Sequence, residues 1–490
     1  MVGINSRDEI SLIKGFSDAI ASGNGALFVG SGISSGLGKA SWKTLLLETC
    51  SGLGIDIENT KIPYPEIAQF WVDEQDTNRR ILTDRIEEIL AGRICEVKYQ
   101  ETIYNQICHL NIRDIWTTNY DHIIEDAYSK ITNKRVKVID EDNKILSLSG
   151  KEDVRIYKMH GSLSNPNKMV ITAEDYFSYK RKWPFFSDSL FAGLLQKTFL
   201  FVGFSFDDPN IQNILRTLKD NLDHIRQHHN ESLRQHYLIL YSDACTDEEI
   251  RIERFKIKSL SKLGIKTIKV HRDKDEVSNV FLKLRKYTNR KNIVVAGSCR
   301  GSSTWNSLPE FSAVIGKGII KNKRKYNIHA CYGEGVGKDS IQGALEECSG
   351  SQVHNANNRI CVWPTYEKKG ISDSDKNKID EARASMVKNA AICIFMGGEW
   401  GTYEEFVLAR KYKKFCIPIG ITGGVTKEKI LLEYYDYVDE MCESNNVCGE
   451  GRAILLLKIK EMGASENFGD VKESLFDLID YYHDHQFGES

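Results

Sequence analysis

Four short stretches of the sequence carry residue types that suit nucleotide binding and proton transfer. The stretch LFVGSGISSGLG, residues 27–38, holds four glycines, and such turns let backbone N–H groups approach a phosphate between a strand and a helix. Its spacing, G-x-G-x-x-x-G, is one residue longer than the ordinary dinucleotide-binding pattern. The stretches TTNYD at 117–121, KMHG at 158–161 and GFSF at 203–206 add an amide, an imidazole that accepts protons near neutral pH, and further small residues.

Each of these stretches follows an apolar run that is typical of a buried parallel strand. The runs are ALFVG, DIWTTNY, VRIYKMHG and TFLFVGFS, and helical sequence separates them. This alternation predicts an α/β fold with a parallel sheet. Because ligands bind beyond the carboxyl ends of such strands, the four stretches should converge on one cleft.

The chain is long enough for two domains. Ser6 and Glu9 form a capping-box pattern that begins a helix, and the strands HYLILYS and IKTIKV lead to a helix at about 275–287. The charged segment NRKN follows, so we place a domain boundary there, dividing the chain into 1–288 and 289–490. The second part starts with NIVVAGSCRGSS and continues with apolar runs and glycine turns, which predicts a second, smaller α/β unit.

The composition is that of a soluble globular protein. The chain has 490 residues, 41% of them hydrophobic and 27% charged, and a net charge of -2, which disfavours a nucleic-acid partner. It contains neither a run of ~18 apolar residues nor the apolar core of a signal peptide, so we expect a cytoplasmic protein without membrane contact. The 12 cysteines are scattered and form no C-x-x-C pair, which favours buried free thiols over disulfides or structural zinc.

The four stretches resemble the ordered motifs of the sirtuin NAD-binding domain, over roughly residues 10–270. The resemblance implies a sirtuin-like Rossmann-type domain with NAD as its substrate. The zinc-ribbon cysteines of protein-deacylating sirtuins are missing, so we expect no zinc or other metal and no cofactor beyond NAD. The resemblance implies that NAD contacts Gly30, Ser31, Gly32, Ser34, Thr118, Asp121, Gly203 and Ser205, and that Asn119 and His160 are catalytic.

The chemistry of such a cleft follows from these residue types. Nicotinamide leaves as the ribose acquires oxocarbenium character, His160 acts as general base toward water or a ribose hydroxyl, and Asn119 orients that group. Water then gives ADP-ribose. Simpler interpretations exist: a histidine after a strand is often structural, and Asn119 suits a turn. We interpret Asp207 and Asp208 as a turn into a helix at Ile211, and the pair at 228–229 as surface histidines without a metal.

The glycine turn GEGVG in the second unit, residues 333–337, does not match a P-loop. Tyr332 stands where that pattern needs glycine, and Asp339 stands where it needs serine or threonine. A phosphate-binding turn and a close crossing of helix and strand remain equally open.

The stretch GGEWGTYEE, residues 397–405, resembles the glycine signature of lysine-decarboxylase-like, nucleotide-sensing SLOG proteins, with one extra residue. That insertion favours binding over phosphoribohydrolase activity. An arginine beside such a turn suits a pyrophosphate, and a glutamate suits ribose hydroxyls. The expected nucleotide-binding residues are Gly297, Ser298, Gly333, Gly335, Gly337, Arg383, Gly397, Gly398, Gly401, Thr402 and Glu405.

A sirtuin-like domain joined to a Rossmann-like SLOG domain resembles the effector family of Thoeris anti-phage defence systems. The resemblance implies that the SLOG domain binds a cyclic ADP-ribose isomer made by a TIR-domain partner protein. It also implies that the sirtuin-like domain then hydrolyses NAD, that loss of NAD arrests the infected cell, and that the chain forms a homotetramer. Three alternatives stay open: an NAD-dependent protein deacylase, a non-catalytic nucleotide-sensing module, and a C-terminal hydrolase of nucleotide monophosphates.

Overall fold

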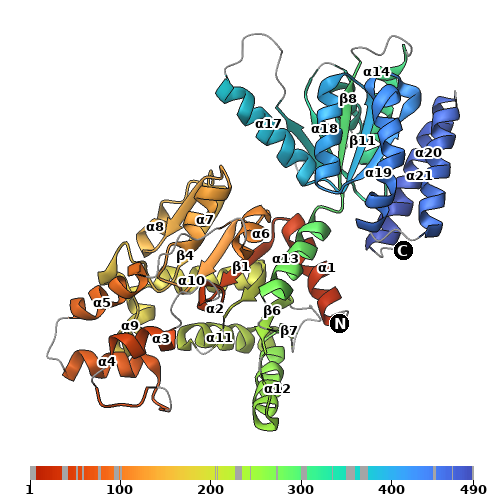
Figure 1. The fold of residues 1–490 in the computed structure, drawn as a ribbon. Coiled ribbons are helices and arrows are strands. Elements are labelled where there is room, and N and C mark those ends of the chain that lie inside the picture. The colour runs from red at the N-terminus through yellow and green to blue at the C-terminus, as the bar shows by residue number, and fades with distance from the viewer. Residues whose placement is uncertain are drawn as a thin grey trace. The chain divides into compact units, whose positions relative to one another are not determined.

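The computed structural model divides the chain into two compact units, Met1–Thr288 and Asn289–Ser490. In each unit, helices surround a central sheet (Figure 1). The structure describes residues 7–35, 42–50, 53–57, 60–74, 79–92, 99, 102–204, 206, 208–226, 234–242, 244–271, 274–299, 306–333, 335–348, 359–364, 373–444, 449–465 and 467–487.

The first unit is built on a seven-stranded parallel sheet with the strand order β3-β4-β2-β1-β5-β6-β7. The two central strands, β1 and β5, are buried along their whole length, as their apolar sequences predict. The strands are β1 (Gly25–Val29), β2 (Asp114–Thr117), β3 (Val136–Ile139), β4 (Val154–Lys158), β5 (Thr198–Val202), β6 (His236–Tyr241) and β7 (Ile265–Val270). The predicted α/β class with parallel strands is confirmed.

Strand β3 is the one strand of this sheet that the apolar runs did not indicate. It is a short edge strand, and lysine alternates with valine in its sequence VKVI. Because an edge strand needs few apolar residues, its sequence does not stand out from a loop.

Helices connect the strands of the first unit and cover its sheet. The apolar face of α1 holds Leu12, Phe16 and Ile20, and this helix packs on α13. The helices are α1 (Arg7–Ala21), α2 (Ser31–Ser35), α3 (Trp42–Thr49), α4 (Tyr64–Glu74), α5 (Arg79–Gly92), α6 (Ile103–His109), α7 (Ile123–Ile131), α8 (Asp142–Leu146), α9 (Ala173–Lys182), α10 (Pro184–Gln196), α11 (Pro209–Arg226), α12 (Asp247–Lys262) and α13 (Lys274–Thr288). The serine of the predicted first capping box lies outside the described residues.

Helices α3, α4 and α5 form a helical module with a core of its own. Leu46, Ile67 and Ile86 are fully buried in that core, and Trp71 packs with them. The same cluster includes residues of the loops that follow β2 and β4, namely Tyr120, Met169 and Ile171. The module therefore packs directly on the loops that carry the predicted chemistry.

The second unit is a five-stranded parallel sheet with the order β10-β9-β8-β11-β12. From β8 the chain runs outward through β9 to β10 at one edge of the sheet, and it then returns to the other side of β8 as β11. The strands β8 and β11 therefore form a topological switch point. The strands are β8 (Asn292–Ser298), β9 (Asn327–Cys331), β10 (Ile360–Trp363), β11 (Ile392–Gly397) and β12 (Phe415–Ile419), and the helices are α14 (Leu308–Lys321), α15 (Val336–Cys348), α17 (Asp373–Lys388), α18 (Trp400–Lys411), α19 (Leu431–Ser444), α20 (Gly449–Ala464) and α21 (Phe468–Phe487).

None of the helices in the described part of the chain is long and apolar enough to span a bilayer. The described cysteines are free thiols, and most are buried, for example Cys50, Cys393 and Cys416.

We predict that Gly203→Ala destabilises the protein more than Gly23→Ala does. Both glycines have positive φ, 63° and 75°, so alanine is strained at either position by about 1–2 kcal/mol. A Cβ at Gly203 would lie 2.6 Å from the backbone nitrogen of Ile33, whereas one at Gly23 would meet nothing within 4 Å. We therefore expect Gly203→Ala to cost about 1–3 kcal/mol more in urea denaturation. Equal losses would contradict the close approach of the two loops.

Candidate active site

A cavity of about 640 Å³ lies in the first unit, between the carboxyl ends of the strands and the helical module. Leu45, Tyr64 and Leu90 line it from the module side. On the sheet side it is lined by Tyr241 at the end of β6 and by residues that follow β1, β2, β4 and β5, among them Ser31, Gly32, Thr118, Asn119, Tyr120, Asp121, His160, Gly203 and Asp208. The four stretches singled out in the sequence thus converge on one cavity.

Most of the residues expected to contact NAD lie at this cavity, and three need separate mention. Gly30 is buried, is not among the residues that line the cavity, and approaches Gly203, which is. Ser34 belongs to the short helix α2, and Ser205 lies outside the described residues.

The glycines after β1 and β5 hold two loops in close contact. The N–H of Gly30 donates to the carbonyl of Val202 (2.9 Å), and the N–H of Gly32 donates to the carbonyl of Gly203 (2.9 Å). A Cβ on Gly30 would lie 2.2 Å from the Gly203 oxygen. We expected these N–H groups to face a phosphate; in the structure they join the loops that form the cavity floor.

The loop that carries Asn119 is fixed from both ends. The Asn119 N–H donates to Thr117 Oγ1 (3.0 Å), and Asp121 Oδ1 accepts from the N–H of Ile123 (3.1 Å) at the start of α7. The fully buried ammonium of Lys158 contacts the Asp121 carbonyl and pairs with Glu125 Oε1 at 2.8 Å. Burial opposes the charge of Glu125, but Lys158 nevertheless lowers the pKa of that carboxyl. The charged pair holds the Asn119 loop against β4.

His160 is almost completely buried, with 3% of its surface exposed. Its carbonyl accepts from the N–H of Val170 (3.0 Å), and its ring meets the edges of Tyr176 and Tyr179, with centroid distances of 5.3 and 6.2 Å. Its Nε2 lies 3.1 Å from Asp208 Oδ2. The imidazole thus sits in a fixed position at the cavity wall.

Asp208 is a residue of the site that the sequence interpretation missed. It does form the predicted turn, since its Oδ1 accepts from the N–H of Ile211 (3.0 Å) at the start of α11. Its other oxygen faces His160. Burial opposes ionisation of Asp208, but His160 and the backbone N–H groups of Asn210 and Ile211 hold its pKa below the usual value. The sequence indicates the turn at Asp208, but no local pattern indicates that this side chain meets His160, which lies in a distant loop.

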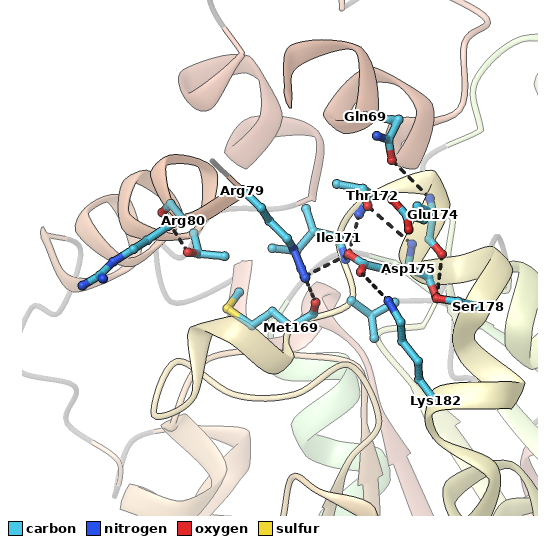
Figure 2. Close-up of polar contacts among 12 residues, drawn as sticks. Gln69, Arg79, Arg80, Met169, Ile171, Thr172, Glu174, Asp175, Ser178 and Lys182 are labelled. Carbon is cyan, nitrogen blue, oxygen red and sulfur yellow. Dashed lines mark hydrogen bonds and ion pairs between the residues drawn. The ribbon is translucent and has the colours of Figure 1, made fainter. Parts of the chain in front are cut away.

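The segment after His160 is tied to the helical module by one carboxylate. Figure 2 shows Arg79, at the start of α5, pointing toward Asp175 of α9 and the carbonyl of Met169. The Arg79 to Asp175 ion pair measures 2.9 Å, and Asp175 Oδ2 also accepts from the N–H groups of Ile171 and Thr172, each at 3.0 Å. The module, the segment 169–172 and α9 therefore meet at this side chain.

Among the described residues, no group of three or more histidine, cysteine, aspartate or glutamate side chains is arranged to hold a metal ion.

The glycine turns of the second unit follow β8, β9 and β11, the three adjacent strands at its switch point. Ser298 ends β8, and its carbonyl accepts from the N–H of Gly398 (2.8 Å). A Cβ on Gly297 would lie 1.9 Å from the Met396 oxygen, and one on Gly337 would lie 2.1 Å from the Cys331 oxygen. The predicted nucleotide-binding residues that follow these strands in the sequence also include Gly333, Gly335, Gly401 and Thr402. Close packing is thus the observed role of Gly297 and Gly337.

Arg383 and Glu405, which we expected beside the same turn, pair with each other. Arg383 Nε lies 3.3 Å from Glu405 Oε1, its Nη1 lies 3.3 Å from Glu404 Oε2, and its Nη2 donates to the carbonyl of Gly401 (2.8 Å). Burial raises the pKa of Glu405, although Arg383 acts in the opposite direction. The guanidinium therefore links α17 to the first turn of α18.

Comparisons with known proteins agree with both units. A model of the SIR2-like domain matches residues 113–268, and a model of the Sir2- and TIR-associating SLOG family matches residues 276–455. The NAD(+) hydrolase ThsA of Bacillus cereus (strain MSX-D12) is 28% identical over 437 residues, which cover 85% of this chain and 87% of that protein. The NAD(+) hydrolase ThsA of Enterococcus faecium is 28% identical over 466 residues, covering 89% and 93%.

This chain is ThsA-like, with a SIR2-like domain and an SLOG domain. The resemblance to these two domain types that the motifs indicated is confirmed. The residues matched as SIR2-like include Asn119, His160 and Asp208, whereas the glycine loop after β1 precedes them. The SLOG match begins within α13, a helix that packs in the first unit on α1 and α6.

We predict that Lys158→Met destabilises the ThsA-like chain by about 3–5 kcal/mol near neutral pH, because it leaves the Glu125 carboxylate buried without its partner. The double variant Lys158→Met/Glu125→Leu should recover most of that loss in urea denaturation. In the wild type, the contribution of this pair to the free energy of unfolding is fully present at pH values above the ordinary glutamate pKa. It is lost as the pH falls through the lowered pKa of Glu125. The stability that Lys158→Met loses relative to the wild type should therefore become smaller in acid. A loss of stability that does not depend on pH would contradict this account.

Proposed function

We propose that the first unit hydrolyses NAD+ to ADP-ribose and nicotinamide, and that the second unit activates this reaction when it binds a cyclic ADP-ribose isomer. The observation that carries the proposal is the convergence of Asn119, His160 and the two glycine loops on one cavity. The relatives named NAD(+) hydrolase ThsA, which align with most of the chain, support the same reaction.

In the proposed reaction, the bond between C1′ of the ribose and the nicotinamide nitrogen breaks, and its electron pair leaves with neutral nicotinamide. The oxygen of a water molecule bonds to C1′, and His160 takes up the proton that this water loses. Asn119 orients the water or a ribose hydroxyl, since its amide both donates and accepts hydrogen bonds. We assign the contacts to NAD to the residues around this pair, including Ser31, Thr118 and Asp121.

In the second unit, we assign the signal to the carboxyl ends of β8, β9 and β11. Arg383 would contact a pyrophosphate and Glu405 ribose hydroxyls, so the ligand would have to replace the pairing of these two side chains with each other. The name of the matched family, which associates it with TIR, supports a TIR-domain protein as the source of the signal.

We further propose that the chain acts in the cytoplasm as a homotetramer in Thoeris anti-phage defence. Hydrolysis of the cellular NAD pool would arrest an infected host. Such an activity has to be nearly absent without its signal, and a change from 1:99 to 99:1 between idle and active states takes ~5.5 kcal/mol of differential binding. A separate sensing unit can supply that difference.

We predict that His160→Ala and Asn119→Ala each lower NAD+ hydrolysis by about 10²-fold or more, because each removes a group that handles the attacking water. Nicotinamide and ADP-ribose should be followed by chromatography, with and without a cyclic ADP-ribose isomer. His109→Ala is the control, since His109 ends α6 and does not line the cavity. Full hydrolysis by either variant would refute its catalytic role, and release of nicotinamide only with an acetyl-lysine peptide would indicate a deacylase.

We predict that Arg383→Ala raises the concentration of cyclic ADP-ribose isomer needed for half-maximal activation by about 10–100-fold. This is the loss expected when hydrogen bonds between charged groups are removed. Because this change leaves Glu405 buried without its partner, Arg383→Ala/Glu405→Gln should be measured beside it, with melting temperatures. Arg410→Ala is the control, because Arg410 lies on α18, the helix that carries Glu405, but pairs with Glu433 at 3.1 Å. Normal activation of both Arg383 variants would remove this residue from the sensor site.

A further inference from the structure

The charged neighbour of His160 is Asp208, which comes from a different loop of the first unit. His160 Nε2 and Asp208 Oδ2 are 3.1 Å apart, and both side chains are buried at the cavity wall. The carboxylate is held independently of the histidine, since its Oδ1 accepts from the N–H of Ile211 (3.0 Å) and its Oδ2 accepts from the hydroxyl of Tyr176 (3.4 Å). It therefore offers the ring a fixed negative charge.

The other titratable groups around the ring come from three elements. Tyr176 and Tyr179 face it from α9, and burial raises the pKa of both hydroxyls well above the usual value, so they stay neutral. Tyr120, from the loop after β2, is also neutral for the same reason. Asp121 lines the cavity on that loop, and Lys158 directs its ammonium toward Asp121 and Glu125. Among the described residues, Asp208 is the charged group paired with the ring.

We infer that Asp208 is the positioning residue for His160 in NAD+ hydrolysis, an inference that rests on the proposed role of His160 as general base. Because Nε2 lies 3.1 Å from the carboxylate, we assign the hydrogen of the neutral ring to Nε2, which leaves Nδ1 as the nitrogen that accepts a proton. When water adds to C1′ and nicotinamide leaves with the electron pair of the broken bond, the proton of water passes to Nδ1. Asp208 stays ionised and stabilises the imidazolium, as the aspartate of a serine protease triad does.

The helix-capping role of Asp208 allows the two functions of this side chain to be separated. Asparagine caps helices as well as aspartate does, so Asp208→Asn keeps the contact with Ile211 but removes the charge, while Asp208→Ala removes both. The matched control is Asp142→Asn. Asp142 accepts from the N–H groups of Phe185 and Phe186 (3.0 and 3.1 Å) at the start of α10, but it does not line the cavity.

The experiment measures NAD+ hydrolysis by the full chain, with saturating cyclic ADP-ribose isomer, as a function of pH. We expect Asp208→Asn to keep the wild-type melting temperature and to change KM by no more than a few-fold. Its kcat should fall by about 10²-fold or more. We also expect the pH profile of Asp208→Asn to differ from that of the wild type, because the variant lacks the carboxylate that faces the ring. Asp142→Asn should keep the wild-type kcat and profile.

Three outcomes would be informative. A wild-type kcat and pH profile for Asp208→Asn, with His160→Ala inactive, would overturn the inference and leave the proposed function intact. The inference would also be overturned if Asp208→Asn stayed active while Asp208→Ala lost activity and melted at a lower temperature. The helix cap alone would then account for the effect of this side chain. Full activity of His160→Ala would instead overturn the assignment of the base on which the inference rests.

Discussion

The close approach of the loops after β1 and β5 is the constraint on which the first unit's cavity depends. Two neighbouring parallel strands end side by side, and the chain must turn away from both without filling the space above them. Glycine at positions 30, 32 and 203 lets backbone meet backbone, and the hydrogen bonds from Gly30 and Gly32 to Val202 and Gly203 close the contact. A side chain at these positions would meet the backbone of the facing loop, so the loops would have to move apart and the cavity floor would change.

The two side chains that we propose as catalytic depend on a second layer of polar contacts. Asn119 is held through Thr117 and through the buried Lys158, while the backbone of His160 is held by Val170. Val170 lies in a segment that Asp175 fixes with its carboxylate, and Arg79 ties that carboxylate to the helical module. The wall formed by the sheet and the wall formed by the module are thus connected by hydrogen bonds and one ion pair.

The sequence was informative wherever function requires a small or polar residue directly after an apolar strand. That pattern indicated the α/β class, the ends of β1, β2, β4 and β5, and the meeting of Asn119 with His160 at one cavity. It could not indicate β3, whose Lys137 suits an edge strand, or the core of the helical module. Asp208 was predicted as a turn and does form one. Its contact with His160 depends on how two distant loops meet, which no local pattern records.

In the second unit, the pairing of Arg383 with Glu405 sets a condition on any ligand that would use these two side chains. Arg383 already contacts Glu405, Glu404 and the carbonyl of Gly401, so a lone anion gains little by taking the guanidinium from partners that satisfy it. Glu405 is buried, and separating it from Arg383 without a substitute leaves its carboxyl without the group that favours its charged form. A ligand that presents a pyrophosphate to the arginine and hydroxyl donors to the glutamate would satisfy both sides at once. In the proposed sensor site, selectivity for such a nucleotide would arise from the cost of breaking the pair, because a simple phosphate would leave Glu405 without a partner.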